Sequence, residues 1–532
     1  MTKQAVYLKQ NVMMEPLFDH WYAWSYLISP ATAAMYIANQ HLKIMRSFVN
    51  APQTHVIARQ DPAMRGGPFI PYEVSRAGEI KELIQETEKR QGRLLELAEA
   101  IKTLDLLLAG EANGFSLQPL YRQVPEILKG YVELVYDLNN HASVRFIEPL
   151  LYRSPVYDSR SQSIQLSLIE EDERAFVFST PRLKEKGSVR LDVTFDSDGI
   201  DQLFRMREIP QPVGVAEDAL GVCGCDRELF SSFFTEEPPR VSSRYPGDDI
   251  RIRYLGHACV LIESREVSIL CDPVISYENK AGLGRYTYQD LPDRIDYILI
   301  THNHQDHCMF ETLLQLRHKT DTIVVPRNNG GGLADPSLKL ALQQIGFRQV
   351  VELDELESIP VSGGAIVGLP FPGEHGDLNI RTKMAYLVTL NNRSIMLLAD
   401  SNNLEPRLYE HFHQLFGDVD LLLIGMECDG APMSWLYGPL LTRPLPRKMD
   451  QTRRFDGSNS ARAVEMVDRL NCKQVYVYAM GQEPWLTFLT SIRYTDESRP
   501  IVESDKLVEE CRRRGIPSER LFGSKEIHLN GC

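Results

Sequence analysis

The chain has 532 residues, of which 43% are hydrophobic and 24% are charged, and its formal net charge at pH 7 is -14. This length predicts two or three domains, and the negative charge argues against a general nucleic-acid binder. The absence of a signal-peptide pattern and of any run of about 18 apolar residues, together with nine scattered cysteines, predicts a cytoplasmic protein without a membrane span.

Residues 1–245 predict an N-terminal mixed α/β domain without a motif that indicates chemistry. Aromatic, alanine and methionine residues over 17–48 are typical of one or two amphipathic helices, and the apolar spacing over 77–108 predicts one long helix that ends at Gly110. A further helix is predicted, and β-like runs follow it; these elements are expected at 122–138, 144–149, 164–169, 174–178 and 188–194. Such a domain is suited to dimerisation, to recognition of a substrate or carrier, or to covering a site.

A stretch rich in proline and serine at 235–249 precedes residues 246–532, for which we predict a catalytic domain. Short β-like runs come first, at 251–255, 259–263, 267–271 and 296–301. Helices are then expected at 309–318, 335–345, 403–415, 459–470 and 504–514. Strands alternate with them, at 322–326, 349–353, 384–390, 394–399, 420–425 and 474–479. This alternation predicts a layered α/β fold.

Three histidines and an aspartate follow the apolar run 297–300 within a few positions: His302, His304, Asp306 and His307. Imidazole and carboxylate groups bind borderline transition metals, and ordinary surface histidines do not explain this density. Residues two apart in an extended segment project to the same side, so His302 and His304 are expected to bind one ion. Asp306 and His307 follow where the chain turns, and we expect them to face a second ion.

Further ligands are expected where later strands end. The turn at 371–377 offers two neighbouring donors, Glu374 and His375, and neighbours do not easily aim at one metal. One of the two is therefore expected to bind and the other to support it. Asp400 ends a buried run and has the two oxygens needed to bridge two cations. The alternative role of Asp400 is to cap the helix that follows.

The segments Leu255-Gly-His257-Ala and Leu270-Cys-Asp272-Pro, followed by the histidine-rich loop, resemble the metallo-β-lactamase fold over residues 250–532. The resemblance implies a four-layer αβ/βα sandwich with a two-metal site at one edge. It also implies that Asp272 orients the metal loop, although the same residue is suited to a simple turn before proline.

Zinc hydrolases of this fold usually add a histidine from a late strand end. The corresponding place here, 475–485, contains none and leaves Glu483 without a defined role. Carboxylates beside few imidazoles, with open coordination positions, suit iron and oxygen chemistry better than structural zinc. The spacing alone does not exclude the alternative function, a zinc-dependent hydrolase of a thioester, lactone or phosphodiester.

A closer similarity covers the full length. The loop 301–307, the turn at Glu374, the strand end at Asp400 and the segment 427–439 are similar to CmlA-type β-hydroxylases. These di-iron monooxygenases of nonribosomal peptide and antibiotic biosynthesis use dioxygen to hydroxylate the β-carbon of an amino acid held as a thioester on a carrier protein. The resemblance implies two Fe ions and six ligands, with Glu374 and Asp400 also catalytic: His302, His304, Asp306, His307, Glu374 and Asp400.

The resemblance also implies three partners. They are a carrier domain bearing aminoacyl-phosphopantetheine, an external electron donor, and a second copy of the chain in a homodimer. Because carrier domains are acidic, a basic docking segment is expected. A candidate follows the 427–439 loop and contains Arg443, Arg447, Lys448, Arg453 and Arg454, although a solvated loop explains these charges equally well. The sequence does not predict which amino acid, aromatic or aliphatic, is hydroxylated.

Overall fold

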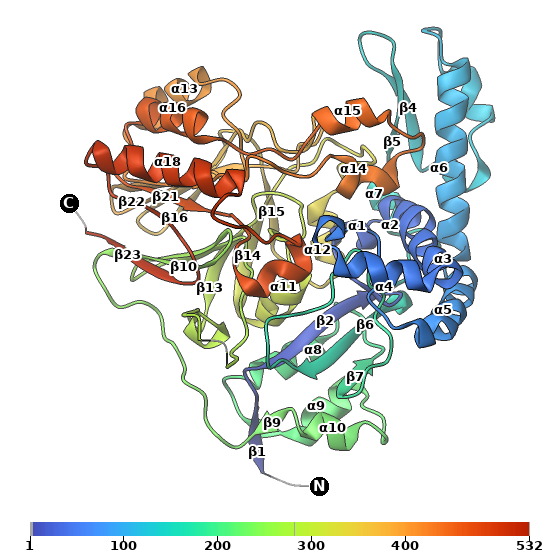
Figure 1. The fold of residues 1–532 in the computed structure, drawn as a ribbon, viewed down its shortest axis with the longest axis horizontal. Helices are drawn as coiled ribbons and strands as arrows, with labels where there is room; N and C mark the ends of the chain where they lie inside the picture. Colours follow the sequence, from blue (N-terminus) through green and yellow to red (C-terminus); the bar gives the residue numbers. More distant parts are fainter. Residues whose placement is uncertain (1–3, 281, 531–532) are drawn as a thin grey trace.

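The computed structural model describes residues 4–280 and 282–530, and two seven-stranded sheets form its centre (Figure 1). The first sheet has the order β15-β14-β13-β12-β11-β10-β23. Strands β12 to β15 pair in parallel, and the other neighbours are antiparallel. In sheet order the strands span Val350–Leu353, Thr320–Pro326, Ile295–Leu299, Ser268–Cys271, Cys259–Glu263, Ile250–Gly256 and Lys525–Leu529.

The second sheet has the order β16-β17-β18-β19-β20-β21-β22. Strands β16 to β19 are antiparallel and β19 to β22 are parallel. In sheet order the strands span Ser358–Val361, Gly364–Leu369, Ala385–Leu390, Arg393–Leu397, Leu421–Gly425, Val475–Tyr478 and Ser518–Arg520. The central strands β12, β20 and β21 are buried along their whole length, as expected for strands covered on both faces.

Alternate side chains of each strand face opposite layers. Ile262, Leu299 and Leu423 belong to the apolar cluster between the sheets, whereas Leu422 packs toward the outer helices α13, α16 and α18. Helices α11 and α12 lie on the free face of the first sheet. The predicted four-layer αβ/βα sandwich is therefore confirmed. These helices span Arg407–Phe416, Ser460–Leu470, Arg499–Arg513, Phe310–Leu316 and Leu338–Gln344.

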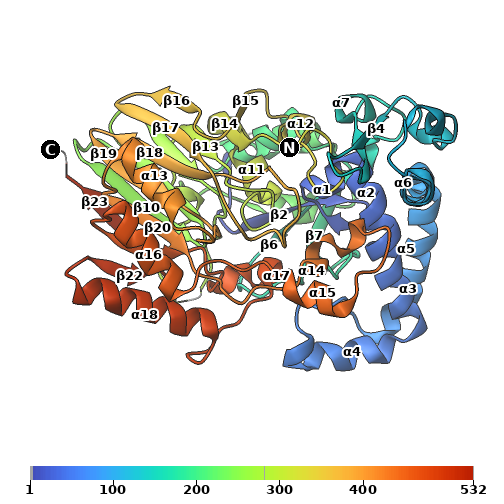
Figure 2. The same ribbon diagram turned by 90° about the horizontal axis from the view of Figure 1, so that it is seen from above.

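The N-terminal half is mixed α and β, as predicted, and it lies on the side opposite α13, α16 and α18 (Figures 1 and 2). Its largest sheet has the order β3-β2-β6-β7, formed by Trp21–Tyr22, Val12–Phe18, Gln162–Leu168 and Ser188–Leu191. Smaller sheets, β8-β1-β9 and β4-β5, are formed by Gln211–Pro212, Ala5–Leu8, Phe234–Thr235, Val132–Tyr136 and Ala142–Phe146. Helices α1 to α6 span Ser25–Ile28, Pro30–Tyr36, Leu42–Asn50, Pro52–Gln60, Ala77–Arg90 and Gly92–Glu111.

Short helices complete the chain. In the N-terminal half these are α7 to α10, which span Glu148–Leu151, Asp198–Arg205, Val213–Leu220 and Arg227–Ser231. In the C-terminal half they are α14, α15 and α17, which span Ser434–Tyr437, Arg447–Thr452 and Thr487–Thr490. Helices α14 and α17 lie beside the functional site described below.

A buried ionic network joins the two halves. Arg182 makes two 2.8 Å bonds to the Glu15 carboxylate, and Arg174 bridges Glu15 at 2.9 Å to Glu311 of α11 at 2.7 Å. The Tyr22 hydroxyl donates to Glu311 at 2.8 Å. Because buried charges are costly unless paired, this network fixes the N-terminal half on the α11 layer. An apolar cluster shared by both halves surrounds it. The proposed domain boundary at 245/246 stays a prediction.

Four local predictions differ from the structure. Residues 17–48, predicted to form one or two amphipathic helices, begin with the end of β2 and with β3, and helices α1 and α2 are buried on all sides. The long helix at 77–108 is divided at Gln91, whose buried side chain bonds to Ser161 across the fold at 2.8 Å, and α6 continues through Gly110. The prediction of a helix at 122–138 is wrong, because residues 132–136 form strand β4 of a hairpin. The apolar spacing of this segment also fits the alternation of a strand. The run at 174–178 is not a strand, since Arg174 is drawn into the buried ionic network.

The ionic network predicts a pH-dependent stability. Burial alone would raise the pKa of Glu15, but Arg182 and Arg174 outweigh it and lower the pKa to about 2. Its stabilisation is therefore complete above the ordinary value of about 4.5 and is lost as the pH falls toward 2. Glu15→Gln should lower the free energy of unfolding at pH 7 by about 3 kcal/mol.

The measurement is urea unfolding of both proteins from pH 7 to pH 2, and the difference should shrink below about pH 4.5. Glu133→Gln, at an exposed ion pair with Arg145, is the matched control and should change stability by less than about 1 kcal/mol. A Glu15→Gln effect no larger than the control would contradict the role given to the network.

Candidate metal centre

The strand ends that carry the predicted ligands meet at one edge of the two sheets. In the first sheet, β12 is followed by Asp272 and β13 by the loop 301–307. In the second sheet, β17 leads to the turn with Glu374, and β19 leads to Asp400. The structure therefore places side chains from both sheets around one point, at the carboxyl ends of these strands.

One group of donors consists of His302, His304 and Glu374. The His302 Nε2 and His304 Nδ1 atoms are 3.1 Å apart, and Glu374 Oε1 lies 3.2 Å from His304 Nδ1. Two ligand atoms that are each about 2.1 Å from an ion, at right angles, are separated by about 3 Å. The spacing therefore fits a shared ion. The Tyr437 hydroxyl lies 3.0 Å from His304 Nε2 and occupies the other side of that ring.

A second group lies around His307 and Asp306. Asp400 Oδ2 is 3.1 Å from His307 Nε2 and 3.8 Å from His302 Nε2, so this carboxylate stands between the two groups. That position suits a bridging carboxylate. Its alternative role as a helix cap does not hold, because α13 begins at Arg407. The six ligand assignments themselves stay predictions.

Asp272 supports the metal loop through hydrogen bonds. Its Oδ1 accepts from the backbone N–H of Thr301 at 2.7 Å. Its Oδ2 accepts from the Thr301 hydroxyl at 2.5 Å and lies 2.8 Å from His307 Nδ1. A proton on that ring nitrogen leaves the His307 Nε2 lone pair for a metal. Asp272 is fully buried and has a left-handed backbone, with φ of 39°, so the fold maintains a costly conformation here.

His257 is a functional residue that sequence reasoning did not single out. The backbone N–H of Gly481 donates to His257 Nδ1 at 3.1 Å, so the proton belongs on Nε2. That nitrogen lies 3.2 Å from Asp306 Oδ2. His257 therefore faces Asp306 and, together with Asp306 and His307, forms one of the clusters of possible metal donors. The sequence feature that could have identified His257 is its position in the Leu255-Gly-His257 turn between β10 and β11.

The structure separates the roles of Glu374 and His375. Glu374 belongs to a three-donor group, whereas His375 stacks on His304 with ring centroids 4.6 Å apart and contacts Glu374 through Nδ1. Burial lowers the pKa of His375 to about 4, so the ring is neutral at pH 7. Burial would raise the pKa of Glu374, but His304 and His375 hold it well below its usual range.

Several polar atoms at the centre lack a hydrogen-bond partner among the described residues. They include His307 Nε2 and Asp400 Oδ1, and both are buried. Orphaned buried acceptors are costly, and cations bound between the two groups would satisfy them. The residues present therefore fit a dinuclear metal cluster with nitrogen and carboxylate ligands.

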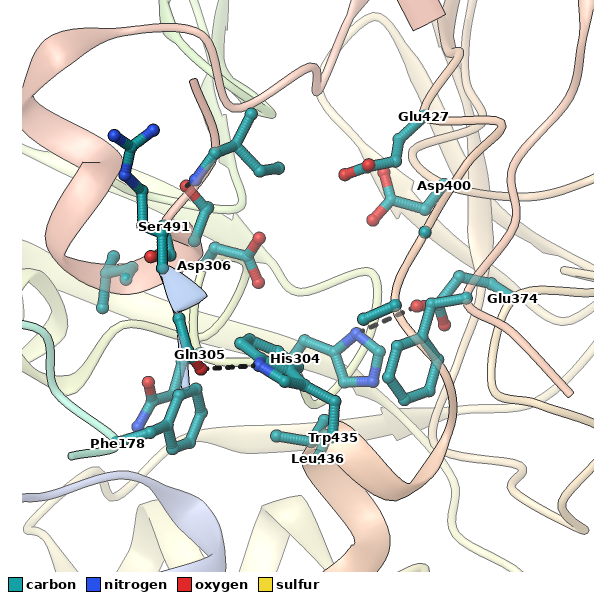
Figure 3. A pocket seen from close by; sticks show the side chains of 18 residues that line it. Phe178, His304, Gln305, Asp306, Glu374, Asp400, Glu427, Trp435, Leu436 and Ser491 are labelled. Carbon is teal, nitrogen blue, oxygen red and sulfur yellow. Dashed lines mark hydrogen bonds and ion pairs between the residues drawn. The ribbon is translucent and has the colours of Figure 1, made fainter. Parts of the chain in front are cut away.

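A cavity of about 300 Å³, which we term the metal cavity, opens onto these ligands (Figure 3). His304, Asp306, Glu374 and Asp400 form its polar side. Its other walls are mainly apolar and include Phe178, Trp435, Leu436, Phe455, Leu489 and Ile492.

Glu427 also lines the metal cavity, where its carboxyl group lies beside that of Asp400 (Figure 3). Burial and the charge of Asp400 raise the pKa of Glu427 to about 8. The 427–439 segment was noted in the sequence, but nothing local marked its first residue as functional. Only the position of β20 beside β19 brings Glu427 to the cavity.

Glu483 has a structural role outside the metal cavity. Its buried Oε1 accepts a hydrogen bond from the Tyr254 hydroxyl and lies 3.4 Å from the backbone N–H of Gly523. The late strand end thus supplies no further donor to the three-donor groups among the described residues.

Part of the predicted docking segment is engaged within the fold. Arg453 donates to the Gly376 carbonyl at 2.7 Å, directly beside the Glu374 turn, and Arg454 lies 3.5 Å from Asp429. Arg447 and Lys448 of α15 are exposed. Substitution of Arg453 would therefore disturb the metal centre as well as any docking surface.

This geometry defines a metalloprotein whose dinuclear site lies at the edge of an αβ/βα sandwich. Residues 251–433 match the beta-lactamase superfamily domain, and residues 7–238 match the diiron non-heme beta-hydroxylase N-terminal domain. In the part of the chain that the structure describes, no helix is long and apolar enough to cross a membrane.

The chain belongs to the CmlA-type diiron β-hydroxylases. It is 40% identical to the 4-amino-L-phenylalanyl-[CmlP-peptidyl-carrier-protein] 3-hydroxylase of Streptomyces venezuelae, over 98% of this chain and 99% of that protein. The crystal structure of CmlA, a diiron beta-hydroxylase from Streptomyces venezuelae, superposes with a TM-score of 0.93 and 38% identity, over 99% of this chain and 100% of that one. A mutant of CmlA superposes with a TM-score of 0.91.

The protein is therefore a di-iron monooxygenase, and the expectations of two Fe ions and dioxygen are confirmed. The comparisons favour this function over the zinc-dependent hydrolase that the sequence left open. The carboxylate-rich donor set of the structure agrees with that outcome.

The support given by Asp272 can be tested by Asp272→Ala. The change removes the acceptor of three hydrogen bonds, and we expect iron affinity to fall about 10–100-fold because His307 loses its fixed orientation. The measurement is anaerobic titration of the apoprotein with Fe²⁺, with circular dichroism to confirm the fold. Asp321→Asn, at an exposed ion pair with Arg294, is the control. Unchanged affinity in a folded Asp272→Ala protein would refute the orienting role.

Proposed function

We propose that this enzyme hydroxylates the β-carbon of an amino acid that is held as a thioester on the phosphopantetheine arm of a carrier domain. The observation that carries the proposal is the burial of His302, His304, His307 and Glu374 beside a cavity whose other walls are mainly apolar. A substrate on a long arm can reach such a site while the carrier stays outside. The relative in Streptomyces venezuelae, which acts on 4-amino-L-phenylalanyl carried by CmlP, supports the same substrate class.

We further propose the ligand set. His302, His304 and Glu374 would hold one ion, and Asp306 and His307 the other. Asp400 would bridge the two ions, and it would share the catalytic role with Glu374. The spacing of the donor atoms and the orphaned acceptors support this assignment.

The cluster, when bound, supplies the reducing equivalents and the dioxygen chemistry for insertion of one oxygen atom into a C–H bond. The chain's own residues position the substrate and exclude water. Phe178, Leu436 and Phe455 form apolar walls against which an aromatic or aliphatic side chain can pack. The Glu427 carboxyl, whose pKa is raised by burial, lines the cavity beside Asp400.

Two further parts of the proposal, the electron donor and the location of the enzyme, go beyond what membership of the family shows. We propose an external reductase, because the chain shows no flavin or iron–sulfur motif of its own, and a cytoplasmic location, because the exposed and buried cysteines are all free thiols among the described residues. We also keep the proposed division into domains 1–245 and 246–532, which the proline-rich stretch at 235–249 supports.

We propose that the enzyme is a homodimer that associates through the N-terminal half. Helix α6 and the β4–β5 hairpin project from the molecule (Figure 1). Large apolar side chains are exposed here: Leu106 at 59%, Phe115 at 79% and Leu138 at 102% of their full areas. Exposed apolar residues that gather on one projection are typical of an interface.

The reaction is tested by mass spectrometry of carrier domains loaded with single amino acids, after incubation with reduced enzyme and isotopically labelled dioxygen. One labelled oxygen atom should be gained at the β-carbon of the correct amino acid. Glu374→Ala and Asp400→Asn should each lower the product at least about 100-fold, because each removes a ligand. The proposal fails if no loaded amino acid gains oxygen, or if the free amino acid reacts equally well.

The dimer is tested by light scattering after size-exclusion chromatography. Wild type should elute with twice the mass of one chain, and the double variant Phe115→Asp, Leu138→Asp should elute as a monomer with its fold intact. Leu356→Asp, at a residue that is 53% exposed on the catalytic half, should remain a dimer. Dimers in all three proteins would exclude this interface.

A further inference from the structure

Three cavities meet above the candidate metal centre. The metal cavity adjoins one of about 590 Å³, which we term the arginine cavity, and one of about 480 Å³, which we term the apolar cavity. Gly66 lines all three. The arginine cavity shares Arg65 and Ser491 with the metal cavity, whereas the apolar cavity shares Phe178 and Trp435 with it. Each outer cavity therefore borders the metal cavity and defines a candidate route from the surface to the ligands.

The two routes are separated by a contact between the halves of the chain. The indole N–H of Trp435 donates to the Gly66 carbonyl at 3.1 Å, and the Phe178 ring packs edge-on against the indole at 5.3 Å. Gly66 has φ of +73°, and a side-chain carbon there would lie 3.7 Å from the indole Nε1 of Trp435. The partition is close-packed, so a ligand follows one route or the other.

The arginine cavity is strongly basic. Its charged lining consists of four arginines and one glutamate: Arg59, Arg65, Arg174, Arg493 and Glu173. Arg174 is held in the buried ionic network, and Arg59 donates to a backbone carbonyl at 2.7 Å. Arg65 and Arg493 are exposed, and no acidic partner lies within 4.0 Å of either among the residues that the structure describes. Their guanidinium groups are thus available to an anion.

The apolar cavity offers a different environment. Its lining includes one charged side chain, Lys43, and otherwise consists of amide, hydroxyl, apolar and glycine residues. A phosphate gains more from two guanidinium groups, each able to donate two parallel hydrogen bonds, than from a single ammonium. The arginine route is therefore the one suited to a phosphate-bearing chain.

We propose that the arginine cavity is the entrance for the phosphopantetheine arm, with Arg65 and Arg493 binding its phosphate. The arm then follows the lining that the two cavities share, at Arg65, Gly66 and Ser491, where the absence of a side chain on Gly66 leaves room, and places its acyl thioester in the metal cavity. Arg65 comes from the N-terminal half and Arg493 from the catalytic half, so the phosphate is held where the two halves meet. This inference rests on the proposed carrier-bound substrate, and it assigns the docking face to this mouth rather than to the segment around α15.

The phosphate contact is tested with two small molecules, phosphopantetheine and pantetheine, which differ only in the phosphate. Iron-loaded wild-type enzyme should bind phosphopantetheine at least about tenfold more tightly in isothermal titration calorimetry. The double variant Arg65→Gln, Arg493→Gln should lose this preference. It should also raise KM for a loaded carrier domain about tenfold, with a smaller change in kcat.

Two control variants test the alternative binding sites for the phosphate. Lys43→Gln removes the cation of the apolar cavity, and the double variant Arg447→Gln, Lys448→Gln removes the exposed cations of α15. Both should retain the wild-type preference for phosphopantetheine and the wild-type KM. Loss of the preference in either control, or its retention in the Arg65, Arg493 variant, would overturn the assignment. Equal binding of both compounds by wild type would overturn it as well.

The test separates this inference from the proposed function. If wild type oxygenates a loaded carrier but the arginine variant behaves as wild type, the route is wrong and the reaction stands. If wild type oxygenates no loaded carrier, the proposed substrate class is wrong, whatever the binding data show.

Discussion

The metal centre depends on one buried carboxylate, that of Asp272. It accepts hydrogen bonds from the backbone and hydroxyl of Thr301 and faces His307 Nδ1, and so fixes the start and the end of the loop 301–307. Because β12 and β13 are parallel neighbours, their ends lie side by side and the loop has a rigid base. The donors that the second sheet contributes, Glu374 and Asp400, face the histidines of this loop.

The functional site also depends on the contact between the N-terminal half and the catalytic half. The buried ionic network of Glu15, Arg174 and Glu311 fixes the N-terminal half against α11, and the shared apolar cluster extends that contact. This fixed placement brings Phe178 and Gly66 over ligands that belong to the other half. The catalytic half supplies the metal site, and the N-terminal half supplies part of the wall and entrance that select a substrate.

The electrostatics of the centre also follow from the fold. Carboxylates and imidazoles that are far apart in sequence share one small buried volume, so their charges hold the pKa of Glu374 and of Asp306 below their usual ranges. Glu427, which has no comparable cation beside it, has its pKa raised to about 8 by the same burial. The pKa values of carboxylates in one cavity are thus shifted in opposite directions, according to the charges beside each one.

The sequence by itself determined the layered α/β class, most strands of the catalytic half and the dense His302–His307 motif, because these depend on local periodicity and on the spacing of donors. Tertiary structure alone decided the rest. His257 and Glu427 reach the site only because β10 and β20 end at its edge, and residues 132–136 became a strand only because a partner strand was available. The helix is divided at Gln91, where the side chain donates a hydrogen bond to Ser161, 70 residues away in the sequence. Such choices depend on neighbours distant in sequence, and no local pattern records them.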